Sequence, residues 1–230
     1  MSDLEREALW LSLRVASVAV IATTPFALAL AWLLARGRFA GKAVLESVVN
    51  LPLVLPPVVI GYALLIAFGR QGLLGRWLHD TLGLQFVFTF RGAVLAASVM
   101  ALPLVVRAMR QALEAVDTGL EAAARTLGAS PARVFTTITL PLMAPGLLSG
   151  AVLGFAASLG EFGATITFVS NVPGETQTLP LAIYSALQQP GGDAAAARLV
   201  IWAALLAFAA LGLAQWCHRR LQRWLGQAPP

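Results

Sequence analysis

Long hydrophobic runs separated by short polar stretches dominate the chain. Five of these runs approach the roughly 20 residues that an α-helix needs to cross a bilayer. They cover residues 8–34, 43–68, 92–113, 142–167 and 199–216. Because lipid offers no hydrogen-bond partner to an unpaired backbone group, each run is expected to be helical. The pattern predicts an all-α membrane helix bundle of about five spans, forming one domain over residues 1–230.

Composition also indicates that lipid is the solvent of this chain. Charged residues make up 12% of the 230 residues and hydrophobic residues 58%, whereas a typical soluble domain has about 25% charged residues. The net charge of +5 forms no basic face, because the charges lie between the apolar runs, so nucleic acid is not an expected partner. Residues 1–7 are acidic, unlike the positive start of a signal peptide. The first run is therefore expected to remain as a membrane anchor.

The distribution of basic residues predicts the orientation in the membrane. With the N-terminus outside, ten of the 16 Lys and Arg residues fall on the cytoplasmic side. The six outer ones are matched by six acidic residues. The inverted topology would place the minority inside, against the positive-inside rule, so an N-out, C-in chain is expected. The ten are Arg36, Arg38, Lys42, Arg107, Arg110, Arg125, Arg133, Arg219, Arg220 and Arg223.

Two stretches on the predicted outer side are not simple spans. Residues 70–91 contain three glycines around Trp77 and are expected to form a short amphipathic element on the outer surface. Residues 172–193 begin and end with Pro-Gly turns and enclose the short apolar segment 179–187. This segment either dips into the outer mouth of the bundle or lies on its surface.

The predicted cytoplasmic stretch 114–141 indicates a helical hairpin. Asp117 or Thr118 can cap a first helix, and Gly128 can end it in a left-handed turn. Ser130 can then cap a second helix that has Pro131 at its first position. An apolar stripe on such a hairpin requires a partner surface. The stripe consists of Leu120, Ala123, Ala124, Leu127, Val134 and Phe135.

The same hairpin resembles the EAA loop of ABC importer permeases. That loop has Glu-Ala-Ala, a glycine, and Ile-x-Leu-Pro ten residues after the glycine, and this chain has Glu121, Gly128 and Ile138 in that order. The usual glutamate position is Ala122, so the carboxylate lies one residue earlier. The resemblance implies a coupling helix that docks on an ATPase subunit. The residues it implies are Glu121, Ala122, Ala123, Ala124, Gly128, Ala129, Ser130, Pro131, Val134, Ile138, Leu140 and Pro141.

No Gly-x-x-x-x-Gly-Lys-Ser/Thr phosphate loop occurs in the chain, so ATP with its magnesium is expected to be used by a separate ATPase subunit. No cofactor, metal site or catalytic residue is predicted. The resemblance implies a bacterial inner-membrane permease that works with a second copy of itself, an ATPase dimer and an external oxyanion-binding protein. A stand-alone secondary transporter would not need a docking hairpin. An intramembrane enzyme would need a catalytic set, and the histidines are only His79 and His218.

Other segments are similar to the oxyanion branch of these permeases, and especially to molybdate permeases. They are residues 51–65, 69–72 and 158–180, so with the hairpin the resemblance covers nearly the whole chain. Sulfate permeases share the Gly-Glu-Phe-Gly segment at 160–163, and the longer run through residues 171–176 favours molybdate. Sulfate, thiosulfate and tungstate remain alternative substrates.

Six residues are candidates for the translocation path or its gate. Pro52, Pro56 and Pro57 are expected to break the second span and shape the pore. Ser158 and Thr165 could offer hydroxyl groups to an oxyanion, although either could instead bond its own helix. Glu161 would repel a dianion, so its carboxylate is expected to bond backbone N–H groups or a basic partner and hold a gate in shape.

Overall fold

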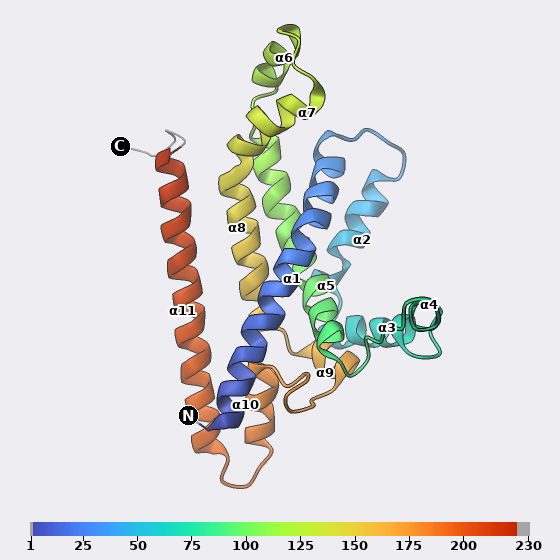
Figure 1. Ribbon diagram of the computed structural model, residues 1–230, viewed down its shortest axis with the longest axis vertical. Helices are drawn as coiled ribbons and strands as arrows, with labels where there is room; N and C mark the ends of the chain where they lie inside the picture. Colours follow the sequence, from blue (N-terminus) through green and yellow to red (C-terminus); the bar gives the residue numbers. More distant parts are fainter. Residues whose placement is uncertain (1, 225–230) are drawn as a thin grey trace.

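The computed structural model describes residues 2–224, and for residues 214, 218, 219 and 221–224 it describes the backbone only. Arg219 and Arg223, two of the residues behind the predicted orientation, lie outside the described side chains. Over this range the structure is a bundle of helices (Figure 1). They are α1 (Asp3–Arg36), α2 (Lys42–Val54), α3 (Pro57–Phe68), α4 (Leu73–Leu82), α5 (Phe90–Glu114), α6 (Thr118–Thr126), α7 (Pro131–Val134), the π-helix η1 (Phe135–Thr139), α8 (Leu140–Leu159), α9 (Gly163–Val169), α10 (Leu179–Leu187) and α11 (Asp193–Trp224).

Four helices in the described range are long and apolar enough to cross a membrane, and a bent pair raises the number to five if it counts as one span. The four are α1, α5, the continuous helix Pro131–Leu159 and α11, and the bent pair is α2 with α3. The predicted all-α membrane bundle of about five spans is confirmed to that extent. The start of α1 and the hairpin of α6 and α7 lie at opposite ends of the molecule (Figure 1).

The second apolar run, 43–68, is not a straight span. Its two helices are bent by 115° at Leu55 and Pro56. A residue that precedes proline is pushed out of the α-helical region, and in the Pro56-Pro57 pair this applies to both Leu55 (ψ 143°) and Pro56 (ψ 136°). Pro52 does not break the chain, contrary to expectation, because it lies inside the continuous helix α2.

The fourth apolar run also differs from the expected continuous helix over 142–167. The helix starts earlier, at Pro131, passes through the π-helix η1 and ends at Leu159. A separate short helix, α9, follows after Gly160, Glu161 and Phe162. The second arm of the hairpin is therefore the first turn of a membrane helix, and not an independent element.

Glycines bring α8 into close contact with α5. Gly146, Gly150 and Gly154 recur every fourth residue and share one face of α8. A Cβ atom on Gly146 would lie 2.1 Å from Cβ of Ala112, and one on Gly154 would lie 2.6 Å from Val105. Small residues at such spacing let membrane helices approach closely. This contact and the packing of α1 on α5 form the core of the bundle.

The end of the molecule opposite α6 is held by polar contacts among α1, α10 and α11. The backbone N–H of Leu179 donates to the buried Ser12 hydroxyl at 2.6 Å. Arg198 of α11 donates to the Glu5 carboxylate at 2.8 Å, and only 5% of the Glu5 side chain is exposed. The apolar segment 179–187 is thus the helix α10, which packs on α1 and α11.

Candidate functional site

The hairpin of α6 and α7 is shaped by the local signals that the sequence contains. The Asp117 carboxylate accepts the Gly119 N–H at 2.7 Å, and the Ser130 hydroxyl accepts the Arg133 N–H at 3.3 Å. Gly128 has a φ of +86°, and the N–H of Ala129 closes back on the carbonyl of Ala124 at 3.0 Å. These two features define a Schellman ending. The predicted caps and left-handed turn are present.

Glu121 faces the bundle and not the outside of the hairpin. Its Oε1 accepts from Arg36 Nη2 at 3.1 Å and from the Thr139 hydroxyl at 2.7 Å. Arg36 also reaches the carbonyl of Leu113, at the end of α5, at 3.5 Å. Glu121 and Thr139 are buried, and about a quarter of the Arg36 side chain is exposed. One ion pair therefore connects α6 to α1, α5 and η1.

The predicted coupling residues divide into an inner and an outer set. Val134 is buried, and the ring centroid of Phe135 lies 5.3 Å from that of Trp32 of α1, in an edge-on arrangement. These two residues of the predicted apolar stripe therefore face the bundle and are not available to a partner. Leu127 is 88% exposed and Leu120 49% exposed. The inner set is Glu121 and Val134, with Ala124, Ala129, Ile138, Leu140 and Pro141 half-buried. The outer set is Ala122, Ala123, Gly128, Ser130 and Pro131, all exposed.

The two helix breaks meet near the other end of the molecule. A Cβ atom on Gly163, at the start of α9, would lie 2.7 Å from Cβ of Pro57, at the start of α3. One turn further along α3, a Cβ atom on Gly61 would lie 2.5 Å from the Ala164 carbonyl. Both glycines are therefore required for this approach. The structure brings together the Pro56-Pro57 bend and the 160–162 break, which are about 100 residues apart in the sequence.

The Glu161 carboxylate accepts the backbone N–H of Ala164 at 2.7 Å, which is one of the contacts expected for it. No ion pair involves Glu161 within the described residues. Glu161 thus caps the first turn of α9, which packs against α3.

Burial separates the six candidate path residues. Pro52, Ser158, Glu161 and Thr165 are buried in the chain, whereas Pro56 and Pro57 are exposed. The Ser158 hydroxyl is buried and has no hydrogen-bond partner among the residues that the structure describes. Among the described residues, no group of three His, Cys, Asp or Glu side chains could hold a metal ion.

Sequence reasoning missed Arg36, Thr139 and the two glycines at the helix breaks. Arg36 was counted only as a loop charge, and it meets a residue 85 positions away. Gly61 and Gly163 interrupt apolar runs, which signals close backbone approach, but their partners could not be read from the sequence.

The arrangement of helices has counterparts among solved transporters. One chain of a bacterial ABC transporter involved in the import of the acidic polysaccharide alginate superposes with a TM-score of 0.77, covering 96% of this chain and 80% of that one at 19% identity. The fold is therefore that of the membrane component of an ABC importer.

The family follows from the sequence as a whole. A family model described as the inner membrane component of binding-protein-dependent transport systems matches residues 24–223, and the chain belongs to this family. The molybdenum transport system permease protein ModB of Escherichia coli K12 is 58% identical over 219 residues, which are 95% of this chain and 96% of that protein. ModB of Haemophilus influenzae is 56% identical, over 97% and 98% of the two chains. A chloroplastic sulfate permease of Chlamydomonas reinhardtii is 41% identical, over 86% of this chain and 53% of that one.

Membership defines the general role of the chain. It is a multi-pass inner-membrane permease of a binding-protein-dependent ABC importer. A separate subunit hydrolyses ATP, and a binding protein delivers the substrate. The chain itself is not an enzyme.

Proposed function

We propose that this chain forms the membrane pathway of a molybdate importer, N-out and C-in, with α6 and α7 on the cytoplasmic side docking an ATPase. The observation that carries the docking role is an exposed apolar tip on a firmly anchored hairpin. Leu127 is 88% exposed, while Glu121 beneath it is held by Arg36 and Thr139. A loop that only packed on its own bundle would bury that leucine.

The anchoring suggests how motion would pass from the ATPase to the spans. A displacement of α6 is passed to α1 and α5 through the Glu121–Arg36 ion pair. Because Arg36 also donates to the Leu113 carbonyl and Glu121 also accepts from Thr139, the hairpin resists rotation relative to the bundle. The second arm continues without interruption from Pro131 to Leu159. A docked ATPase would therefore move three spans together.

The meeting point of the two helix breaks is the proposed gate. Helix breaks at membrane depth occur where backbone groups pack against protein or line a cavity. Pro56 and Pro57 are exposed, and Pro57 lies against Gly163, two residues after the buried Glu161. In this arrangement Glu161 shapes the first turn of α9, and Ser158 and Thr165 reach the path only if the contact of α3 with α9 opens.

A second copy of the chain completes the pathway. The bent pair of α2 and α3 has an apolar surface that is exposed within the described range of residues. Val54 is 80% exposed, Val58 53% and Tyr62 58%. Two copies that face each other across this surface would enclose a path between their gates.

Molybdate is the proposed substrate because two relatives of 56–58% identity, aligned over nearly their full length, are molybdenum permeases. Sulfate is the second candidate, because the sulfate permease of 41% identity and the Gly-Glu-Phe-Gly segment at 160–163 favour it. Tungstate has nearly the size, charge and shape of molybdate and is expected to share the path.

Docking is tested with Gly128→Asp in the assembled complex. An acidic side chain in this exposed turn places a charge at the apolar tip, so the ATPase should no longer co-purify although the permease still inserts. Gly83→Asp is the matched control, because Gly83 is also left-handed (φ +63°), has nothing within 4 Å of its added Cβ, and ends α4, which lies away from the hairpin (Figure 1). Co-purification of the ATPase with Gly128→Asp at the control level would contradict the docking role.

The substrate is tested by uptake of labelled molybdate into vesicles containing the full complex and its binding protein. A large excess of sulfate should leave uptake nearly unchanged, whereas tungstate should compete. Strong competition by sulfate would replace molybdate with the second candidate.

A further inference from the structure

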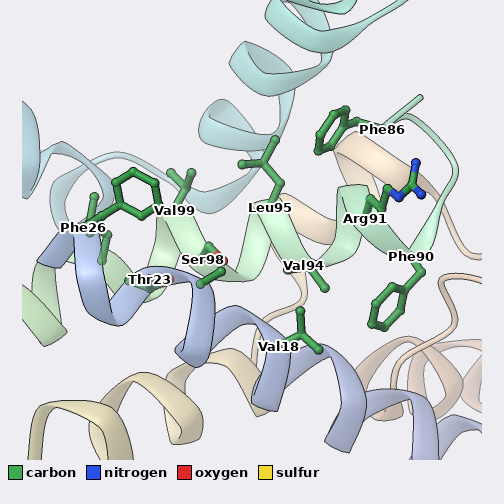
Figure 2. Close-up of a pocket in the computed structure, with 12 residues that line it drawn as sticks. Val18, Thr23, Phe26, Phe86, Phe90, Arg91, Val94, Leu95, Ser98 and Val99 are labelled. Carbon is green, nitrogen blue, oxygen red and sulfur yellow. The ribbon is translucent and has the colours of Figure 1, made fainter. Parts of the chain in front are cut away.

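A hydrophobic groove lies between α1 and α5 on the outside of the bundle. It encloses a cavity of about 420 Å³. Figure 2 shows Val18 and Phe26 of α1 and Val94, Leu95 and Val99 of α5 along it. Phe26 is 70% exposed and Val18 42% exposed. The groove is therefore an apolar surface that no other part of the described chain covers.

One end of the groove is basic. Arg91 lines that end, and Phe90 beside it also lines the cavity (Figure 2). The guanidinium of Arg14 stacks over the Phe90 ring at 5.1 Å from its centroid, so both arginines lie at the same end. Neither arginine forms an ion pair with a carboxylate in the described part of the chain. Two exposed guanidinium groups thus adjoin an apolar channel.

The dimensions of the groove match one leaflet of a bilayer. Arg14 and Arg36 are 22 residues apart on α1, or about 33 Å at 1.5 Å per residue, close to the roughly 30 Å thickness of the hydrocarbon core. Arg14 and Arg91 therefore lie at the level of lipid headgroups. From Arg91 to Leu102 the groove extends along 11 residues of α5, or about 16 Å, which is about half of that thickness.

We propose that this groove binds an anionic phospholipid, with its phosphate on Arg14 and Arg91 and one acyl chain along Val18, Val94 and Val99. The unpaired guanidinium groups supply the complementary charge, and the apolar channel supplies the length for the chain. The site is separate from the coupling hairpin and the gate, so it does not depend on the substrate. A second copy of the chain is the competing occupant, and the experiment distinguishes the two.

The test measures phospholipid retained by the assembled complex from nanodiscs that contain phosphatidylglycerol and phosphatidylcholine, using mass spectrometry. Arg14→Gln with Arg91→Gln should lower the apparent affinity for phosphatidylglycerol about 30-fold, since each basic group near anionic headgroups contributes about 1 kcal/mol. Arg70→Gln with Arg76→Gln is the matched control, because these exposed arginines are on the same side and outside the groove. Arg14→Lys with Arg91→Lys should retain the lipid, because the two positive charges remain, and co-purification of the ATPase with the Gln variant shows that this variant is folded.

A second pair of variants tests the apolar part of the groove. Ala22→Trp fills the cavity and should remove both lipids, whereas Ala29→Trp, exposed on α1 beyond the cavity, should not. Unchanged retention of phosphatidylglycerol by the double variant Arg14→Gln with Arg91→Gln, or by Ala22→Trp, would overturn the proposal. So would efficient disulfide cross-linking between two copies through Ala22→Cys in a Cys217→Ser background, because the groove would then be a contact between copies.

Discussion

Buried contacts of single residues determine what the hairpin can do. Glu121 lies one position from the usual glutamate of the loop, and its carboxylate bonds Arg36 and Thr139 within the chain. Ala122, at the usual position, is exposed. An ATPase that docks here would therefore meet a small apolar residue at this position, and not the Glu121 carboxylate.

Glu121→Ala should destabilise the permease by about 3 kcal/mol, because it leaves the Arg36 guanidinium without its partner in a mostly buried position. The measurement is the free energy of unfolding in detergent, together with the number of ATP molecules hydrolysed per anion transported, which should rise. Glu114→Ala is the control, since Arg110 keeps Glu46 at 2.7 Å and the Glu114 side chain is 49% exposed. Equal effects of the two substitutions would contradict the special role of the Glu121 pair.

Two buried serines offer a contrast between structural and pathway roles. The Ser12 hydroxyl accepts the Leu179 N–H at 2.6 Å, whereas the Ser158 hydroxyl has no hydrogen-bond partner in the described part of the chain. Ser12→Ala should cost about 1–2 kcal/mol of stability, because a buried N–H is left unpaired, while Ser158→Ala should be neutral or stabilising. Anion uptake should fall only for Ser158→Ala. A loss of stability with normal uptake in that variant would remove Ser158 from the proposed path.

At the scale of elements, the contact between α5 and α8 depends on glycine. Gly146→Ala should destabilise the protein by about 1–3 kcal/mol, because its Cβ would lie 2.1 Å from Cβ of Ala112. Gly212→Ala, with nothing within 4 Å of its added Cβ on α11, should be neutral or slightly stabilising. Thermal unfolding of the purified variants measures the difference. Similar melting temperatures of the two variants would show that α5 and α8 can move apart without loss of stability, and would contradict the role of Gly146.

The elements that the sequence predicted well are those with local chemistry. Asp117, Gly128 and Ser130 each act within three residues of themselves, so the hairpin could be derived from spacing alone. The bend at Pro56 was also readable, because two consecutive prolines exclude the helical region before them. The prediction that Pro52 would also break the span is wrong, because Pro52 lies inside the continuous helix α2.

The break at residues 160–162 and the Glu121–Arg36 pair could not be derived in the same way. The break lies in a long apolar run, and its stability depends on the packing of α9 against α3, whose first residues lie about 100 positions earlier. The ion pair joins residues 85 positions apart. Local pattern carries no information on such contacts, so the sequence could nominate Glu161 and Glu121 and could not assign partners to them.

At the scale of the whole molecule, the start of α1 and the hairpin lie at opposite ends, and α11 returns to the hairpin end (Figure 1). Arg36, Arg110, Arg125 and Arg133 all belong to that end. Topology thus restricts the orientation to two choices, one with the hairpin inside and one with it outside. The distribution of charge favours the first, and so does the proposed docking of an ATPase on the hairpin.

Cysteine labelling decides between these two orientations. Cys217 is the single cysteine, so a Cys217→Ser background permits one new thiol at each end. Ala122→Cys, on the exposed face of α6, should react with a membrane-impermeant maleimide in inverted vesicles and not in intact spheroplasts, because ten of the 16 basic residues favour the cytoplasm for this end. Leu82→Cys, 59% exposed on α4, should show the reverse pattern. Labelling of Ala122→Cys in intact spheroplasts would place the hairpin outside, where no ATPase could reach it, and the proposed coupling would fail with it.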